Sequence, residues 1–253
     1  TLSMNLVVLG KPLKGKLYVG TNKHNVWNMK IFRNTKITHS PTIPTIYLIG
    51  DSHSGHYGAA MIDLARKKKF NLIMHPNGNG LKLLKNKHTE YILAPLREYK
   101  NNFKKGDVII FSAHINKYKK ENNWTKQYET FLQQTKNIEM KFILISPTPT
   151  FSGVKNAHIC LEEWYRPSWA ISPLCQVNKG EWFEYNNAPI SQIEEFLLAN
   201  PKVSYIDAFS IICPDPYCKN HDDHSLMYID ESHLTSYGAM KLYKTIETLI
   251  RSK

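Results

Sequence analysis

Long apolar runs are missing from this chain of 253 residues. No segment approaches the ~20 consecutive apolar residues that a helix needs to span a bilayer, so the sequence predicts no membrane-spanning helix. No signal peptide is evident at Thr1, and the chain has no initiator Met. We therefore expect it to be a mature fragment or a piece cut from a longer protein.

Acidic side chains are few compared with basic ones. Asp and Glu number 21 against 33 Lys and Arg, which gives a formal net charge of +12. No recognised nucleic-acid motif or regular aromatic interleaving accompanies this charge, so we expect no nucleic-acid partner. Two interpretations stay open: a solvated lysine-rich surface, or attraction to phospholipid headgroups or acidic polysaccharide. The basic clusters lie mostly in loops and at the ends of predicted elements, which favours the first.

Cysteine is scarce as well, with four residues that all follow residue 159. An even count allows two disulfides, Cys160–Cys175 and Cys213–Cys218, and disulfides persist in the periplasm or outside the cell. A zinc site is the alternative. It would use the Cys-x4-Cys-x2-His-x2-His string formed by Cys213, Cys218, His221 and His224.

Strand-like and helix-like stretches alternate along the chain. Five short apolar runs are typical of strands buried on both faces of a parallel sheet. They are Thr45–Ile49, Asn71–Met74, Val108–Phe111, Phe142–Ile145 and Val203–Ile206. Helix-like stretches are expected at about His56–Lys68, Trp124–Thr135, Ile190–Leu198 and Ser236–Ile250. We predict an α/β fold, a three-layer α/β/α sandwich around a central, mainly parallel five-stranded sheet.

Two distant segments contain side chains suited to acyl transfer. Ser52 directly follows a predicted strand, and Asp230 and His233 lie three residues apart before the last predicted helix. A serine hydroxyl needs a base such as histidine to take its proton, and a carboxylate on the other ring nitrogen orients that base. Either segment alone is an ordinary turn or cap. Together, in these contexts, they predict a catalytic Ser-His-Asp triad.

The two segments resemble conserved blocks of the SGNH (GDSL-like) hydrolases. Gly50-Asp51-Ser52-His53 resembles their first block and Asp230-x-x-His233-Leu234 their last. The match is closest to SGNH domains fused to the C-terminus of acyltransferase-3 membrane proteins, which O-acetylate bacterial surface sugars. Weaker pieces of the same resemblance are Asp107–His114, Pro147-Thr148-Pro149, Cys213-Pro214 with Cys218, and Ser236-Tyr237-Gly238-Ala239. The resemblance carries the short Cys pair without a metal, so we predict disulfides and no metal site.

The middle blocks of the family, which complete its oxyanion hole, match less well. For the second block the chain offers Asn77-Gly78-Asn79-Gly80, where Gly78 or Gly80 could bring a backbone N–H close, or could simply form a tight turn. For the third block, His114 and Asn116 stand where a Gly-x-Asn-Asp run is typical. We take these four residues as candidate oxyanion donors. His53, His56 and His75 receive no role.

Residues 1–40 are rich in Lys, Asn and Gly and are predicted to be an extension that packs on the main domain. Residues 41–253 are predicted to form the SGNH domain. By its resemblance the chain is expected to be a periplasmic O-acyltransferase domain, tethered to the inner membrane through a fused acyltransferase-3 domain. It would modify a surface polysaccharide as a monomer.

The acetyl group would come ultimately from acetyl-CoA through the membrane domain, and the domain itself would bind no cofactor. Two alternatives remain open. One is a secreted carbohydrate O-acetylesterase, in which water replaces the sugar hydroxyl. The other is a catalytically idle glycan-binding module.

Overall fold

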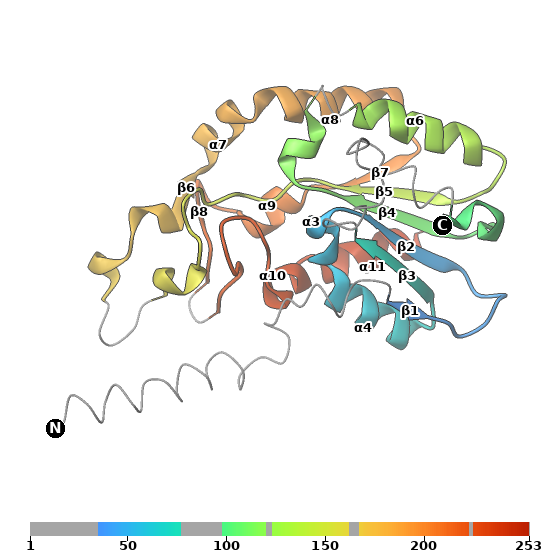
Figure 1. Cartoon of the computed structure of the whole chain (residues 1–253), viewed down its shortest axis with the longest axis horizontal. Helices are drawn as coiled ribbons and strands as arrows, with labels where there is room; N and C mark the ends of the chain where they lie inside the picture. The colour runs from blue at the N-terminus through green and yellow to red at the C-terminus, as the bar shows by residue number, and fades with distance from the viewer. Residues whose placement is uncertain (1–34, 77–97, 120–122, 162–166, 223–224, 253) are drawn as a thin grey trace, which may run out of the picture.

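The fold is built on a six-stranded sheet, seen in a computed structural model that describes residues 35–76, 98–119, 123–161, 167–222 and 225–252 (Figure 1). The strand order is β1-β3-β2-β4-β5-β7. The bounds are β1 Lys36–Ile37, β2 Thr45–Gly50, β3 Asn71–Pro76, β4 Val108–Ser112, β5 Lys141–Ile145 and β7 Val203–Ile206. Strands β3, β2, β4, β5 and β7 run parallel, and β1 pairs antiparallel with β3 at one edge.

Both faces of the sheet are buried, which explains why its strands are continuously apolar. Side chains of a strand alternate between the two faces. In β2, Ile46 and Leu48 enter one core cluster, while Tyr47 and Ile49 enter the other. Neighbouring strands repeat this division, so each face of the sheet has its own hydrophobic core.

Helices cover these two cores on opposite sides of the sheet (Figure 1). One layer contains α4 (Gly58–Lys68), α10 (Ser236–Met240) and α11 (Tyr243–Arg251). The other contains α6 (Trp124–Thr135) and α8 (Asn187–Ala199). Among the residues that the structure describes, no helix combines the length and apolar character needed to cross a bilayer.

The predicted α/β/α sandwich is confirmed, with differences at its edges. All five predicted strands are present and parallel. The sixth strand, β1, comes from within the predicted extension, and its two residues are too few to give a strand signal. The helix predicted at about 56–68 is present as α4, whereas the one predicted at 236–250 is interrupted. The second divides into α10 and α11, and a short unpredicted helix, α3 (Ser52–Gly55), precedes α4.

A small second unit of structure lies beside the main sheet (Figure 1). Here β6 (Gln176–Asn178) pairs antiparallel with β8 (Tyr217–Lys219). The sequence analysis predicted neither strand, and it also missed α7 (Lys179–Tyr185) and α9 (Ala208–Ile212). All four elements are short, and a short element gives too few residues for a periodic pattern to emerge.

The order of strands fixes where a site can form. The chain first places β3 on one side of β2, and later adds β4 on the other side. In parallel α/β sheets, ligands bind outside the carboxyl ends of the strands, at the point where the strand order reverses. In this protein that point is the carboxyl end of β2, from which Ser52 follows.

Candidate active site

Ser52 is the first residue of α3, and a tight turn from β2 places it there. Gly50 ends the strand with a φ of 140°, a conformation that side chains rarely adopt. Gly50 pairs with Ser112 of β4, and a Cβ on Gly50 would lie only 1.8 Å from the carbonyl oxygen of Ser112. Glycine at position 50 therefore lets β2 and β4 meet where the turn to Ser52 begins.

Asp51 joins this turn to the loop that follows β4. Its buried carboxylate caps α3 by accepting the backbone N–H of His53 at 2.8 Å. The same carboxylate accepts the backbone N–H of His114 at 3.0 Å. Burial raises the pKa of Asp51 above the usual aspartate range, although these two hydrogen bonds oppose the rise. Asp51 thus fixes the Ser52 turn against the His114 loop.

Asp230 and His233 lie on one tight turn before α10. The Asp230 carboxylate accepts the backbone N–H groups of Ser232 at 2.9 Å and His233 at 2.8 Å. This is the usual way in which an aspartate organises a turn through its own downstream backbone. The turn brings the His233 ring against the carboxylate, with Nδ1 lying 2.8 Å from Oδ2 and 3.0 Å from Oδ1.

Backbone hydrogen bonds from another loop hold this turn in place. The N–H of Phe151 donates to the carbonyl of Glu231 at 2.6 Å, and the N–H of Ala157 donates to the carbonyl of Ile229 at 3.0 Å. Within the turn, the N–H of Ile229 donates to the carbonyl of His233 at 2.9 Å. The loop after β5 therefore braces the segment that presents Asp230 and His233.

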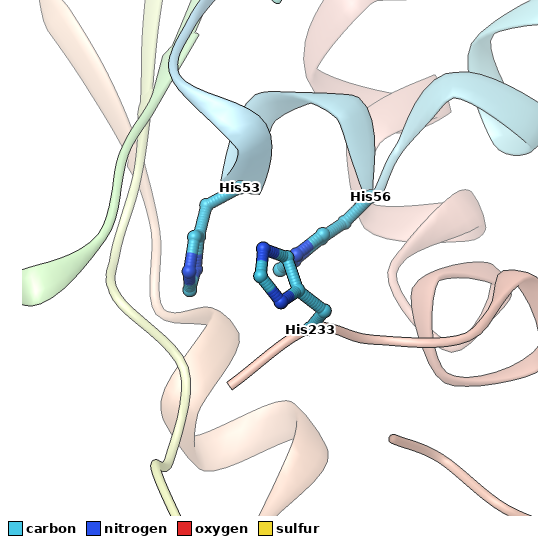
Figure 2. A group of neighbouring side chains, drawn as sticks. All are labelled: His53, His56 and His233. Carbon is cyan, nitrogen blue, oxygen red and sulfur yellow. The ribbon is translucent and has the colours of Figure 1, made fainter. Parts of the chain in front are cut away.

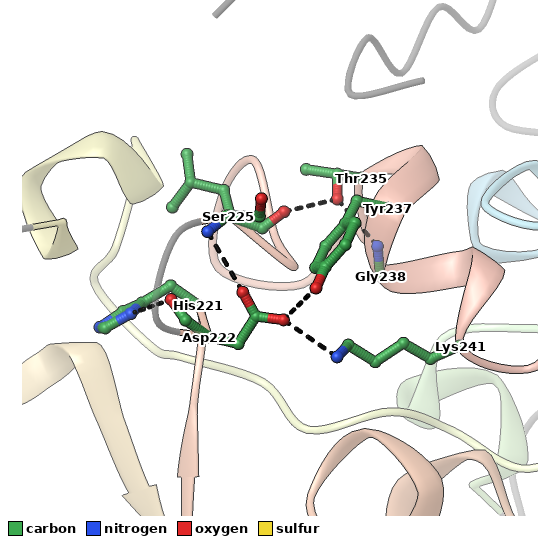
Figure 3. A network of polar contacts seen from close by, with 8 residues as sticks. His221, Asp222, Ser225, Thr235, Tyr237, Gly238 and Lys241 are labelled. Carbon is green, nitrogen blue, oxygen red and sulfur yellow. Dashed lines mark hydrogen bonds and ion pairs between the residues drawn. The ribbon is translucent and has the colours of Figure 1, made fainter. Parts of the chain in front are cut away.

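A polar network secures the chain on either side of the same turn (Figure 3). The Asp222 carboxylate accepts from the Tyr237 hydroxyl and from Lys241 Nζ, the latter at 3.0 Å. Thr235 caps α10 by accepting the N–H of Gly238 at 3.0 Å, and its hydroxyl donates to the carbonyl of Leu226 at 2.7 Å. The segment that leads to Asp230 is thus tied to α10, which follows His233.

The fold brings the three predicted catalytic side chains together. His233 Nε2 lies 3.0 Å from Ser52 Oγ, across a sequence separation of 181 residues. Because the Asp230 carboxylate can only accept, His233 Nδ1 carries the proton and Nε2 is the acceptor for the serine hydroxyl. Burial acts to raise the pKa of Asp230, but the hydrogen bonds from His233 and Ser232 hold it below the usual range. An ionised Asp230 suits the orientation of a base.

Two further histidines, which the sequence analysis left without a role, surround this base (Figure 2). The ring centroids of His53 and His56 lie 5.1 Å and 5.3 Å from that of His233. Both rings are buried, and burial lowers their pKa values well below 6.5, with repulsion from neighbouring histidines acting in the same direction. They therefore stay neutral at physiological pH. The sequence signal was their spacing of three residues, which places both on one side of a helical turn.

The predicted oxyanion donors stay predictions. Gly78 and Gly80 lie outside the described residues. His114 does lie beside the site, with its ring centroid 4.7 Å from that of His53. However, its backbone N–H donates to Asp51, and its Nδ1 accepts the N–H of Asn116 at 3.2 Å. Burial, followed by the charge of nearby cations, lowers the pKa of His114 to about 4, so its neutral ring carries the proton on Nε2.

Both predicted disulfides are present, joining Cys160 to Cys175 and Cys213 to Cys218. The described residues hold no free cysteine. The alternative zinc site is therefore wrong, because its two sulfur ligands are bonded to each other. Of its histidines, His221 contacts the adjacent Asp222 carbonyl at 3.0 Å. His224 lies outside the described residues.

Known proteins of similar structure share this fold. The chain is similar to the periplasmic domain of a lipopolysaccharide acetyltransferase from Salmonella ser. Paratyphi A, with a TM-score of 0.54 and 18% identity over 97% of both chains. It is also similar to a candidate SGNH hydrolase from Slackia heliotrinireducens, with a TM-score of 0.53 and 10% identity over 83% of this chain and 100% of that one. The comparison with curated proteins found no match.

A match to a protein-family model identifies the family of this chain, which the distant structural likenesses do not. Residues 22–248 match the family described as the SGNH domain fused to AT3 domains. The matched range includes the Ser52 turn, the His114 loop and the Asp230 turn. Because the match spans most of its length, this chain belongs to the family of SGNH domains that are fused to AT3 domains.

Proposed function

We propose that this domain is an O-acyltransferase that moves an acetyl group to a hydroxyl of a bacterial cell-surface polysaccharide. The observation that carries the proposal is the hydrogen-bonded series from Ser52 Oγ through His233 to Asp230, with contacts of 3.0 Å and 2.8 Å. These are the distances at which a base can take the proton of a serine nucleophile. Membership of an acyltransferase-linked family supports acyl transfer as the reaction.

The geometry suggests a two-step exchange through an acyl-serine. Ser52 Oγ attacks the acyl carbonyl carbon while His233 Nε2 takes the hydroxyl proton, and the imidazolium then donates that proton to the departing group. In the second step a sugar hydroxyl loses its proton to His233 and attacks the acyl-serine. The new ester forms, the bond to Ser52 Oγ breaks, and His233 returns the proton to that oxygen. Asp230 holds the ring and stabilises its charged form in both steps.

The proposed donor and acceptor rest on the family and on a structural neighbour. The family name supports a fused AT3 domain as the partner of this domain. In the proposal, that membrane domain delivers the acetyl group, ultimately from acetyl-CoA. The similar Salmonella domain is named as part of a lipopolysaccharide acetyltransferase and as periplasmic. It supports a surface glycan as acceptor and an extracytoplasmic site for this domain. That the domain itself binds no cofactor is part of the proposal.

An activated acetyl ester tests the role of Ser52. We expect the wild-type domain to release the chromophore of p-nitrophenyl acetate and to gain the mass of one acetyl group on the peptide that contains Ser52. Ser52→Ala should lose both signals, because removing the nucleophile of a serine triad lowers kcat by a factor on the order of 10⁶. Ser191→Ala, at a half-buried position of α8 whose hydroxyl contacts Asn187, should match the wild type.

The fate of the acetyl group separates transfer from hydrolysis. With an oligosaccharide acceptor present, a transferase gives acetylated sugar, whereas an esterase gives only free acetate. An unchanged rate or an unchanged acetyl adduct in Ser52→Ala would rule out the proposed nucleophile. Free acetate as the only product, at every acceptor concentration, would replace the proposed function with that of an esterase.

A further inference from the structure

Three imidazoles meet at the candidate active site in an arrangement suited to a metal ion (Figure 2). His53 and His56 come from α3 and the residue after it, and His233 comes from the turn before α10. One ring nitrogen from each lies within 4.8 Å of the other two. We propose that these three histidines form a binding site for a divalent transition-metal cation such as Zn²⁺.

The donor set fits such an ion. Neutral imidazole is a preferred ligand of Zn²⁺, and three histidines with one open position are a known arrangement for this metal. Zn–N bonds of 2.0–2.1 Å place the nitrogens of a tetrahedral site about 3.4 Å apart. The rings need therefore move together by only about 1 Å, which side-chain rotation can supply.

The remaining contacts of His233 fit the same role. Its Nδ1 bonds to Asp230 at 2.8 Å, which leaves Nε2 as the nitrogen that would bind the metal. A carboxylate on the far nitrogen of a ligating histidine is a recurrent support of metal sites, because it fixes the ring and strengthens the donor. Ser52 Oγ lies 3.0 Å from the same Nε2, so the nucleophile is next to the proposed site.

Charge and access decide how a cation would reach the site. The protein carries a net charge of +12, which opposes cation binding in general. Locally, however, two carboxylates flank the rings: Asp230 contacts His233, and Asp51 precedes α3. His53 and His56 are 5% and 1% exposed, whereas the His233 side chain is 23% exposed. The cation would therefore arrive on the side of His233.

Metal binding would inhibit the proposed acyl transfer, and this consequence rests on the proposed function. The lone pair of His233 Nε2 cannot bind a cation and accept the Ser52 proton at the same time. Zn²⁺ would thus be a reversible inhibitor that competes with formation of the acyl-serine. A chelator that removes the metal should restore the rate.

Cobalt and zinc titrations of the full chain test the binding site without using its activity. We expect one Co²⁺ per chain with the visible absorption of a tetrahedral complex, and displacement of Co²⁺ by Zn²⁺. Ser52→Ala retains all three rings and should still bind. Asp230→Asn should weaken binding 10–100-fold, as the loss of a supporting carboxylate does elsewhere. His53→Phe and His56→Phe should each weaken it by more than that.

His39→Gln is the matched control, because His39 contacts the carbonyl of Ala65 at the end of α4, away from the site. Circular dichroism checks the fold of each variant, and His53→Gln or His56→Gln replaces the Phe variant at the same position if that variant fails to fold. Absence of saturable Co²⁺ binding by the wild type would overturn the proposal. So would equal affinity in the wild type and both ring variants.

Ester hydrolysis measured with Zn²⁺ tests the inhibition separately. We expect the wild-type rate to fall with a midpoint equal to the Zn²⁺ dissociation constant from the Co²⁺ displacement. If the wild type binds metal but never hydrolyses the ester, the proposed function fails while the metal site stands. If the ester is hydrolysed at the same rate with the site saturated, the inhibitory role is wrong.

Discussion

Two buried aspartates in this protein each hold two segments of the chain together, because each carboxylate accepts backbone N–H groups from both segments. Asp51 caps α3 and also holds the backbone of His114. Asp107, just before β4, accepts the N–H of Thr45 at the start of β2 at 2.8 Å and the N–H of Lys104 at 3.0 Å. Such buried acceptors are costly to remove because they leave backbone donors without partners.

The burial of Asp107 gives the stability a defined pH dependence. Burial raises its pKa above the usual aspartate value, although its hydrogen bonds act against the rise. The folded state then takes up a proton before the unfolded state does. The contribution of Asp107 to the free energy of unfolding should therefore increase as pH falls through its folded pKa, until about pH 4.

Asp107→Asn tests this sign, because the amide does not titrate. Urea unfolding at a series of pH values from 7 to 4 should show the wild type gaining stability relative to the variant as pH falls. The Asn variant should also be less stable near pH 7, by about 1–3 kcal/mol, because one acceptor then faces two N–H donors. A stability difference that is constant with pH would contradict the assigned burial effect.

At the scale of elements, the approach of β2 to β4 positions the site. Gly50 and Ser112 pair at the carboxyl ends of these strands, and Ser52 and His114 each follow two residues later. The close contact at Gly50 keeps the two loops adjacent. Asp51 then joins them by hydrogen bonds. The site thus depends on a strand contact that only a residue without a side chain permits.

Gly50→Ala should therefore damage both stability and activity. A Cβ at position 50 would overlap the Ser112 carbonyl, a backbone atom that cannot move away cheaply. We expect a loss of several kcal/mol in the free energy of unfolding, in the upper range for single substitutions. Chemical denaturation measures it. Gly180→Ala is the control, because its Cβ would meet a side-chain atom of Asn178 at 3.3 Å, which must shift by only a few tenths of an ångström, and no backbone atom. Equal stability of the two variants would contradict the predicted clash.

For the whole molecule, the two disulfides connect the small second unit to the candidate site. Cys175 directly precedes β6, which pairs with β8, and Cys218 lies within β8. The chain then continues to Asn220, whose carbonyl accepts the N–H groups of Met227 and Tyr228, just before Asp230. The bridges therefore restrict the part of the chain that leads to the Asp230 turn.

Removal of the bridge that closes the longer loop should cost more stability. The Cys160–Cys175 bridge spans 15 residues and the Cys213–Cys218 bridge spans 5. The chain-entropy relation gives losses of about 3 and about 2 kcal/mol for the paired Cys→Ser variants. Urea unfolding of the two double variants measures both losses. A greater loss for the shorter loop would indicate that native contacts, rather than loop entropy, dominate.

The sequence by itself determined the architecture of this protein and identified the candidate residues for its chemistry. Its five apolar runs match the parallel strands to within two residues, because burial on both faces forces each strand to be apolar throughout. The Ser52 and Asp230 segments were recognisable because acyl transfer requires those side chains in those turns. Short elements such as β1 and β6 were missed, since their pairing depends on partners that are distant in the chain.

Only the tertiary structure decided which groups meet. It placed His233 within 3.0 Å of a serine 181 residues away, and it packed His53 and His56 around the same ring. In the folded structure the backbone N–H of His114 also donates a hydrogen bond to Asp51, which no local sequence pattern predicts. The physical reason is that the sequence specifies the type of each side chain, whereas the distances between side chains are set only when the parallel strands bring their carboxyl ends to the same edge of the sheet.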